Sequence, residues 1–129
     1  MYQRLVILGN LGKDADLKFA PSGKAVTNFS VATTRHFKKD GEQVKETLWV
    51  KVTLWGDIGE KIINYLTKGQ MVLVEGELIP SQDGNPEVWM DKDNKPHSAC
   101  KMRASTIKLI GGKHEPTEKV EAPEESSEL

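Results

Sequence analysis

Hydrophobic and polar residues alternate strictly along residues 47–56, which read Thr-Leu-Trp-Val-Lys-Val-Thr-Leu-Trp-Gly. Successive side chains of a strand point to opposite faces, so one set of alternate residues should face a core. That set is Leu48, Val50, Val52 and Leu54. The opposite face carries Thr47, Trp49, Lys51, Thr53 and Trp55. Two indole rings with an ammonium group between them therefore occupy the face on which water is expected.

Exposed tryptophans on this face suggest a flat, negatively charged ligand, because uncovered indole rings leave much apolar area in water. Single-stranded nucleic acid is such a ligand, since its bases stack on aromatic rings while its phosphates attract lysine. The alternative is a strand that is buried on both sides, in a sandwich or at a subunit contact, with Lys51 reaching out to water.

Four further segments have the pattern of strands. Residues 2–8 are apolar on both faces, which favours a second cover such as another copy of the chain. Glycines at 9–12 should bend this strand, and residues 17–20 extend past the bend. Residues 25–36 place Phe29 and Val31 inward, residues 70–78 place Val72 and Val74 inward, and residues 98–110 form the last strand.

One helix is expected at residues 58–68. Asp57 and Glu60 have the spacing of a capping box, and Gly69 supplies a stop. Its apolar stripe consists of Ile58, Ile62, Tyr65 and Leu66. Three strands, a helix and two more strands give the element order of the five-stranded OB-fold, a Greek-key barrel. The fold class is therefore all-β with one short helix.

Two hairpin arms should extend from this barrel. Residues 35–41 form a basic hairpin loop that carries Phe37 among Arg35, Lys38 and Lys39. Turn sequences at 83–86 and 91–96 flank residues 88–90, which places Trp89 in the second arm. Both aromatic rings are thus expected outside the core.

Composition divides the chain into two parts. Residues 1–112, the expected OB domain, carry 16 Lys and Arg against 13 Asp and Glu, whereas residues 113–129 carry 2 against 6. The second part has almost nothing to bury, so we expect a disordered acidic tail. The single cysteine, Cys100, excludes an internal disulfide and is expected to be a small buried residue. No apolar run reaches the length of a signal peptide or a membrane span, which predicts a soluble cytoplasmic protein.

At this point the sequence resembles the bacterial-type single-stranded DNA-binding proteins over about residues 1–110. The matching motifs run in the family's order and spacing. They are Gly9-Asn10-Leu11-Gly12 with Asp14, Pro21-Ser22-Gly23, Asn28-Phe29-Ser30-Val31-Ala32-Thr33, Trp49, Trp55-Gly56, Tyr65-Leu66 with Lys68-Gly69, and Val74-Glu75-Gly76.

This resemblance implies that the family's stacking rings fall at Phe37, Trp49, Trp55 and Trp89. It also implies a homotetramer of OB domains with DNA wrapped around it. Two features depart from the family's pattern: residues 79–86 are longer than the usual arm, and the acidic end lacks the Pro-Phe tip, with Leu129 last. The second departure implies weakened docking of replication and repair proteins.

The sequence thus predicts sequence-tolerant binding of single-stranded DNA in replication, recombination and repair, by a nucleoid-associated cytoplasmic protein. The aromatic rings should stack bases, and a set of cations should contact phosphates. These cations are Lys51, Arg35, Lys38, Lys39, Arg4, Lys101 and Arg103.

Three alternatives remain open. One is an OB protein that prefers RNA or associates with primosome proteins. Another is a structural oligomer with buried tryptophans. The third is a metal-dependent nuclease with the acids Glu75, Glu77, Asp91 and Asp93. We expect no catalysis, no metal ion and no cofactor, since no histidine or nucleophile–base pair accompanies these acids.

Overall fold

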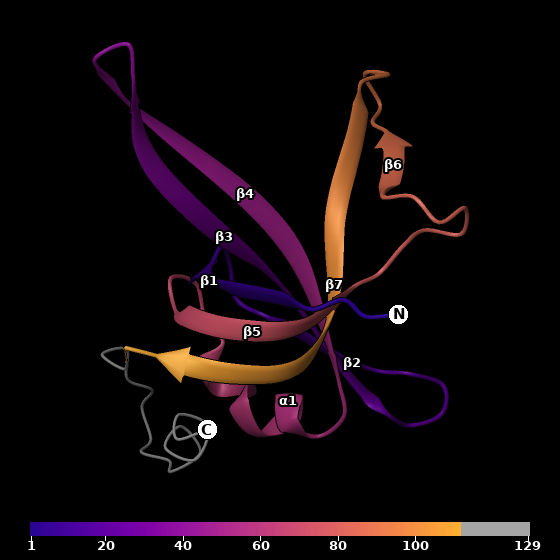
Figure 1. Ribbon diagram of the computed structural model, residues 1–129. Helices are drawn as coiled ribbons and strands as arrows, with labels where there is room; N and C mark the ends of the chain where they lie inside the picture. The colour runs from indigo at the N-terminus through magenta and orange to yellow at the C-terminus, as the bar shows by residue number, and fades with distance from the viewer. Residues whose placement is uncertain (112–129) are drawn as a thin grey trace.

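The computed structural model describes residues 1–111, and these fold into a β-barrel with two projecting arms (Figure 1). The expected domain boundary and the acidic segment 113–129 lie outside the described residues. The elements in chain order are β1 (Leu5–Leu11), β2 (Asp16–Phe19), β3 (Ala25–Lys39), β4 (Glu42–Trp55), α1 (Ile58–Ile62), the 3-10 helix η1 (Ile63–Tyr65), β5 (Met71–Leu78), β6 (Glu87–Met90) and β7 (Pro96–Ile110).

Five strands close the barrel in the order β1-β5-β7-β4-β3, and a pairing between β3 and β1 completes the ring. All these pairs are antiparallel except β4–β7, which is parallel. The strands β2 and β6 add to β3 and β7 outside the ring. The OB-type barrel predicted from the element order is confirmed.

The glycine-rich bend in the first strand is the point at which β1 changes neighbours. Residues 5–10 pair with β5, and Asn10 and Leu11 pair with β3. A Cβ atom on Gly9 would lie 2.2 Å from the carbonyl oxygen of Ala32, so only glycine allows this close crossing. The strand therefore continues to Leu11 rather than ending at Leu8, because the chain passes directly from one neighbour to the other.

The core follows the predicted alternation inside the barrel and departs from it at the rim. In β4, Val50, Val52 and Leu54 are at most 3% exposed, whereas Leu48 is 51% exposed. Cys100 in β7, expected to be buried, is also exposed. Both wrong predictions have one cause, since these residues lie where their strands leave the barrel and no opposite layer covers them.

Two hairpin arms rise from the same end of the barrel (Figure 1). In the first, β3 continues to Lys39, and only Asp40 and Gly41, with φ of 54° and 81°, form the turn. The loop expected at 35–41 is thus mostly strand, because a two-residue turn of this conformation matches the twist of the strands. In the second arm, β6 pairs with the outer part of β7.

The helix is shorter than predicted, and the predicted capping box does not form. Asp57 makes no side-chain capping hydrogen bond, since its own backbone is already helical (φ −78°, ψ −6°), whereas a capping residue is normally extended. Ile58 is 42% exposed, while Ile62, Tyr65 and Leu66 are buried under the barrel. Helical structure ends at Tyr65, and Gly69 lies in the turn before β5. No helix among residues 1–111 is long and apolar enough to span a membrane.

Candidate nucleic-acid interface

The outer face of β4 presents both of its tryptophans to solvent. Trp49 and Trp55 are 53% and 44% exposed, and Lys51 lies between them on the same face. The residues between them, Val50 and Val52, point into the core. Within the single chain this strand is therefore not buried on both sides, so its rings are accessible to a ligand.

Trp49 lies against the backbone of the chain just after β1. A Cβ atom on Gly12 would be 2.5 Å from Cζ3 of the indole, so the ring occupies the place of a side chain at that position. The amide of Gly12 donates to the carbonyl of Ser30 at 3.1 Å, which anchors this support to β3. The sequence motif contained Gly12, but the contact itself depends on a crossing of distant strands that periodicity does not reveal.

A groove of about 570 Å³ runs beside Trp55 over the outer faces of β3, β4 and β7. The parallel register sets Lys51 beside Lys101 and Thr53 beside Arg103. Its lining residues are Lys13, Asp14, Asp16, Asn28, Phe29, Ser30, Lys51, Val52, Thr53, Trp55, Ile79, Lys101 and Arg103. Four of them are cationic and two are acidic. Of the acids, Asp14 accepts the amide of Lys68 at 2.9 Å. The groove thus combines one exposed ring with an excess of positive charge.

Trp89 on the second arm faces this groove. The ammonium of Lys51 lies 4.8 Å from the centroid of the Trp89 ring, a cation–π contact. His97, its cross-strand partner, stacks on Trp89 with centroids 5.5 Å apart and planes inclined by 22°. Trp89, which is 38% exposed, therefore belongs to the same surface as the β4 tryptophans. His97 was not predicted, although the turn between β6 and β7 fixes it opposite Trp89.

The two β7 cations in this surface are paired with carboxylates. Lys101 Nζ lies 2.5 Å from Glu87 Oε1, and Arg103 Nη1 lies 3.6 Å from Glu77 Oε1. The hydrogen bond from Lys101 is the main reason that the pKa of Glu87 is below its ordinary value, and the charge of Lys51 adds to the effect. A phosphate approaching these cations would meet carboxylates already in place.

The first arm carries the remaining predicted ring. The guanidinium of Arg35 lies 4.5 Å from the centroid of Phe37 and also pairs with Glu46 at 2.9 Å. Phe37 is half-buried on a strand rather than exposed on a loop, because β3 continues past it. Lys38 and Lys39 are exposed near the tip. These four candidates form a separate group that leads away from the groove along the arm.

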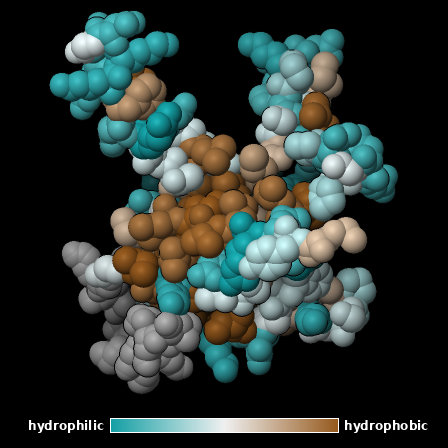
Figure 2. All heavy atoms as spheres, in the orientation of Figure 1, coloured by the Kyte–Doolittle hydropathy of each residue, from teal (hydrophilic) through white to brown (hydrophobic). Residues whose placement is uncertain are grey.

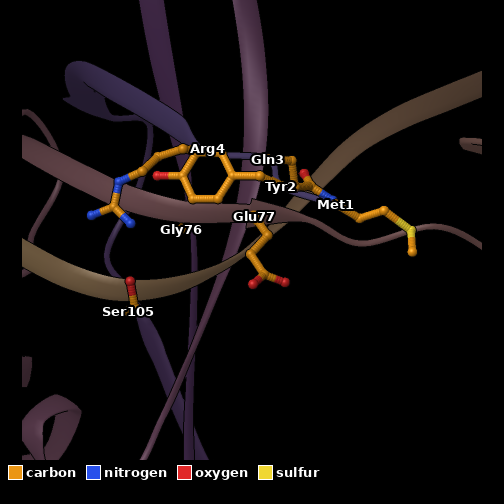
Figure 3. Close-up of a pocket in the computed structure, with 7 residues that line it drawn as sticks. All are labelled: Met1, Tyr2, Gln3, Arg4, Gly76, Glu77 and Ser105. Atoms are coloured by element: carbon orange, nitrogen blue, oxygen red, sulfur yellow. The ribbon is translucent and has the colours of Figure 1, made fainter.

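Arg4 does not join the groove. It lies over β5 and β7 in a pocket with Tyr2, Glu77 and Ser105 (Figure 3). Its guanidinium lies 2.5 Å from Glu75 Oε1, and this hydrogen bond is the main cause of a raised pKa of Arg4. The pairing ties the residue just before β1 to Glu75 on β5, outside the groove.

The four acids of the nuclease alternative do not come together in one site. A β-bulge between Glu75 and Gly76 shifts the register of β5, and Glu75 and Glu77 each pair with an arginine. Asp91 accepts hydrogen bonds from His97 and from the amide of Asp93 in the arm's turn. Among residues 1–111 no group of three His, Cys, Asp or Glu side chains is arranged to hold a metal ion.

Comparisons with known proteins agree on one family. The model of the single-strand binding protein family matches residues 2–110. The single-stranded DNA-binding proteins of Wolinella succinogenes and Helicobacter hepaticus are 35% and 34% identical over 114 residues. Both alignments cover 88% of this chain, and 67% and 64% of those proteins. The protein of Treponema pallidum is 36% identical over 107 residues, covering 83% of this chain and 57% of its own. The chain thus spans about two thirds or less of these relatives.

Solved structures give the same fold. A Plasmodium falciparum SSB in complex with ssDNA superposes with a TM-score of 0.67 at 21% identity, covering 86% of this chain and 97% of that one. A deletion mutant of the single-stranded DNA-binding protein from Thermus aquaticus gives a TM-score of 0.63 at 26% identity, covering 85% and 51%.

Proposed function

Because the chain belongs to the single-strand binding protein family, we propose that it binds single-stranded DNA with little dependence on base sequence. The observation that carries the proposal is the outer face of β4, where two exposed tryptophans flank a lysine beside a cationic groove. Every base offers a ring face for stacking, whereas phosphates supply the charge for the lysine. The relatives named single-stranded DNA-binding proteins support the same activity.

The path of the strand follows from the arrangement of the rings. Trp55, Lys51 and Trp89 lie within or beside the groove, and Trp49 continues the same face of β4. The cations of the first arm extend the positive surface beyond Trp49. We therefore assign Trp49, Trp55 and Trp89 to base stacking and Lys51, Lys101 and Arg103 to phosphates. Arg4 is assigned to the barrel instead, because Glu75 holds it away from the groove.

Equilibrium binding to a labelled oligo(dT), with duplex DNA and a matched RNA as competitors, tests this function. Single-stranded DNA should displace the label and duplex DNA should not, because the bases of a duplex are not free to stack. Affinity should fall with salt as phosphate contacts release counterions. RNA displacing the label better than DNA would favour the RNA-binding alternative instead, and equal displacement by the duplex would contradict stacking.

We also propose that the protein is a homo-oligomer, and the tetramer implied by the resemblance to the family is its expected form. The outer faces of β1 and β5 expose Val6 and Leu8, at 53% and 52%, next to Met71 at 37%. Figure 2 shows a continuous apolar area over these strands in the middle of the face below the arms. An apolar patch of this kind commonly marks an interface between subunits. The proposal of association therefore rests on these exposed apolar residues and not on the barrel fold.

Sedimentation equilibrium tests the assembly. Replacing Leu8 with Asp should dissociate the oligomer, because it places a charge in a contact that excludes water. The exposed Glu60 on α1 provides a control, since Glu60→Gln changes charge far from this face. A monomeric wild-type protein would refute the proposal.

The cellular role proposed here is protection of single strands during replication, recombination and repair, in the bacterial cytoplasm and in association with the nucleoid. It rests on the bacterial relatives named for single-stranded DNA binding. Docking of other proteins by the acidic segment 113–129 remains a prediction, because that segment lies outside the described residues.

A further inference from the structure

Glu87 lies beside the cationic groove, because its carboxylate contacts Lys101, although it comes from the β6 edge strand. It shares a face of β6 with Trp89, and that face is turned toward β4, since Trp89 contacts Lys51. Its carboxylate is 2.5 Å from Lys101 Nζ, and Lys51 is near enough to lower its pKa further. One carboxylate therefore lies under the influence of two ammonium groups from neighbouring parallel strands.

This arrangement is that of an anion site with an anion already in it. Lys51 and Lys101 are adjacent in the β4–β7 register, on the outer faces of strands whose inner residues Val52 and Met102 are fully buried. The strands thus hold the stems of both lysines on a rigid support. Lysine binds carboxylate and phosphate in the same way, as a compact point charge.

We propose that Lys51 and Lys101 form a phosphate subsite, occupied in the free protein by Glu87 and taken over by a backbone phosphate when a single strand binds. The inference rests on the proposed function and assigns to Glu87 the part of an internal competitor. Glu87 belongs to β6, which lies outside the ring of barrel strands, whereas both lysines belong to strands of that ring. The carboxylate can therefore withdraw without any change in the core.

Trp89 couples this exchange to base stacking. Its ring is contacted by Lys51 and by His97 in the free protein. When Lys51 turns to a phosphate it leaves the ring and uncovers part of it for a base. Occupation of the subsite and stacking on Trp89 should consequently occur together.

The salt dependence of binding distinguishes an occupied subsite from an empty one. In the wild type, a phosphate that binds Lys101 must displace the carboxylate of Glu87. One anion replaces another at this lysine, so no net counterion is released there. Without the carboxylate, the same phosphate neutralises a free lysine and releases counterions, which steepens the slope of log K against log salt by about 0.7. Removal of one exposed ion pair and its repulsion of the phosphate should tighten binding about three- to tenfold at low salt.

The experiment measures binding of a fluorescein-labelled oligo(dT) by full-length wild type, Glu87→Gln and Glu60→Gln over a range of salt. Glu60 on α1 is a matched control, because the same charge is removed at the opposite end of the barrel from the arms (Figure 1). A fourth protein combines Glu87→Gln with Lys101→Gln, and Lys101→Gln alone completes the cycle. Thermal unfolding of each variant checks that the barrel is intact.

We expect Glu87→Gln alone to bind oligo(dT) more tightly and to have a steeper slope of log K against log salt. We expect this gain in affinity to disappear in the Lys101→Gln background. The proposal is overturned if Glu87→Gln and Glu60→Gln have the same affinity and the same salt slope, since the change in net charge then accounts for the effect of Glu87→Gln. It is also overturned if the gain persists without Lys101. Failure of the wild type to bind single strands would overturn the proposed function and the subsite with it, whereas the first two results would leave the proposed function standing.

Discussion

Replacement of Trp49 with Ala should weaken binding of single-stranded DNA without loosening the barrel. A tryptophan side chain has an area of about 250 Å², and Trp49 is 53% exposed. About 130 Å² is therefore open to solvent, and a base on one face would cover about half of it. At about 25 cal/mol per Å² this is worth about 1.6 kcal/mol, or about fifteenfold in affinity. The value falls within the range of about 1–3 kcal/mol for one stacked base.

The assay is a titration of labelled oligo(dT) with wild type, Trp49→Ala, Trp49→Phe and Ile58→Ala. Phe should restore most of the affinity, because it retains a flat ring on the same support. Ile58 is exposed to a similar extent, at 42%, but belongs to α1, so its replacement should leave binding unchanged. A loss of less than about twofold for Trp49→Ala, against the range for stacking, would refute the assignment. An equal loss in Ile58→Ala would refute it as well.

Three further outcomes are expected. Gly12→Val should displace the indole of Trp49, shift its fluorescence and weaken binding, and an unchanged spectrum would contradict the contact. Met102→Ala should lower the free energy of unfolding by about 2–5 kcal/mol, measured by urea denaturation, because Met102 is fully buried; a loss below this range would mean that the barrel closes the cavity. The hydrogen bond from His97 is the main cause of the lowered pKa of Asp91, so their contribution to the β6–β7 turn is complete above about pH 4 and is lost as pH falls through the depressed folded pKa. The amide protection factors in this turn should therefore stay constant from neutral pH into weak acid and fall only as Asp91 is protonated, and a fall in weak acid would contradict this sign.

The sequence pattern predicted the barrel because its information is local. Alternation over β4 separates Val50 and Val52 from Trp49 and Trp55, and strand geometry alone converts that pattern into two faces. The prediction failed at Leu48, where alternation continues but the barrel does not, and at Cys100, which was expected to be buried from its residue type and lies at the same rim. The point at which a strand extends beyond its neighbours depends on the lengths of those neighbours. The sequence of one segment does not contain this information.

The ion-pair partners of the charged residues could not be predicted from the sequence either, because they also depend on contacts between distant segments. Arg4 and Lys101 are both cationic, yet Arg4 pairs with Glu75 on the outside of β5, whereas Lys101 lines the groove. The parallel pairing of β4 and β7 decides that Lys51 and Lys101 are neighbours, and this contact joins residues 50 positions apart. Such contacts follow from topology, so the rings could be predicted individually but their assembly into one surface could not.

The most direct test of stacking is intrinsic tryptophan fluorescence during titration of the wild-type protein with oligo(dT), with duplex DNA of equal length as a control. Trp49, Trp55 and Trp89 are the chain's three tryptophans, and all are exposed on the proposed surface. We expect strong quenching that saturates at a fixed number of nucleotides per chain and is weak with duplex DNA. Binding of oligo(dT) without any change in tryptophan emission would contradict stacking on these rings.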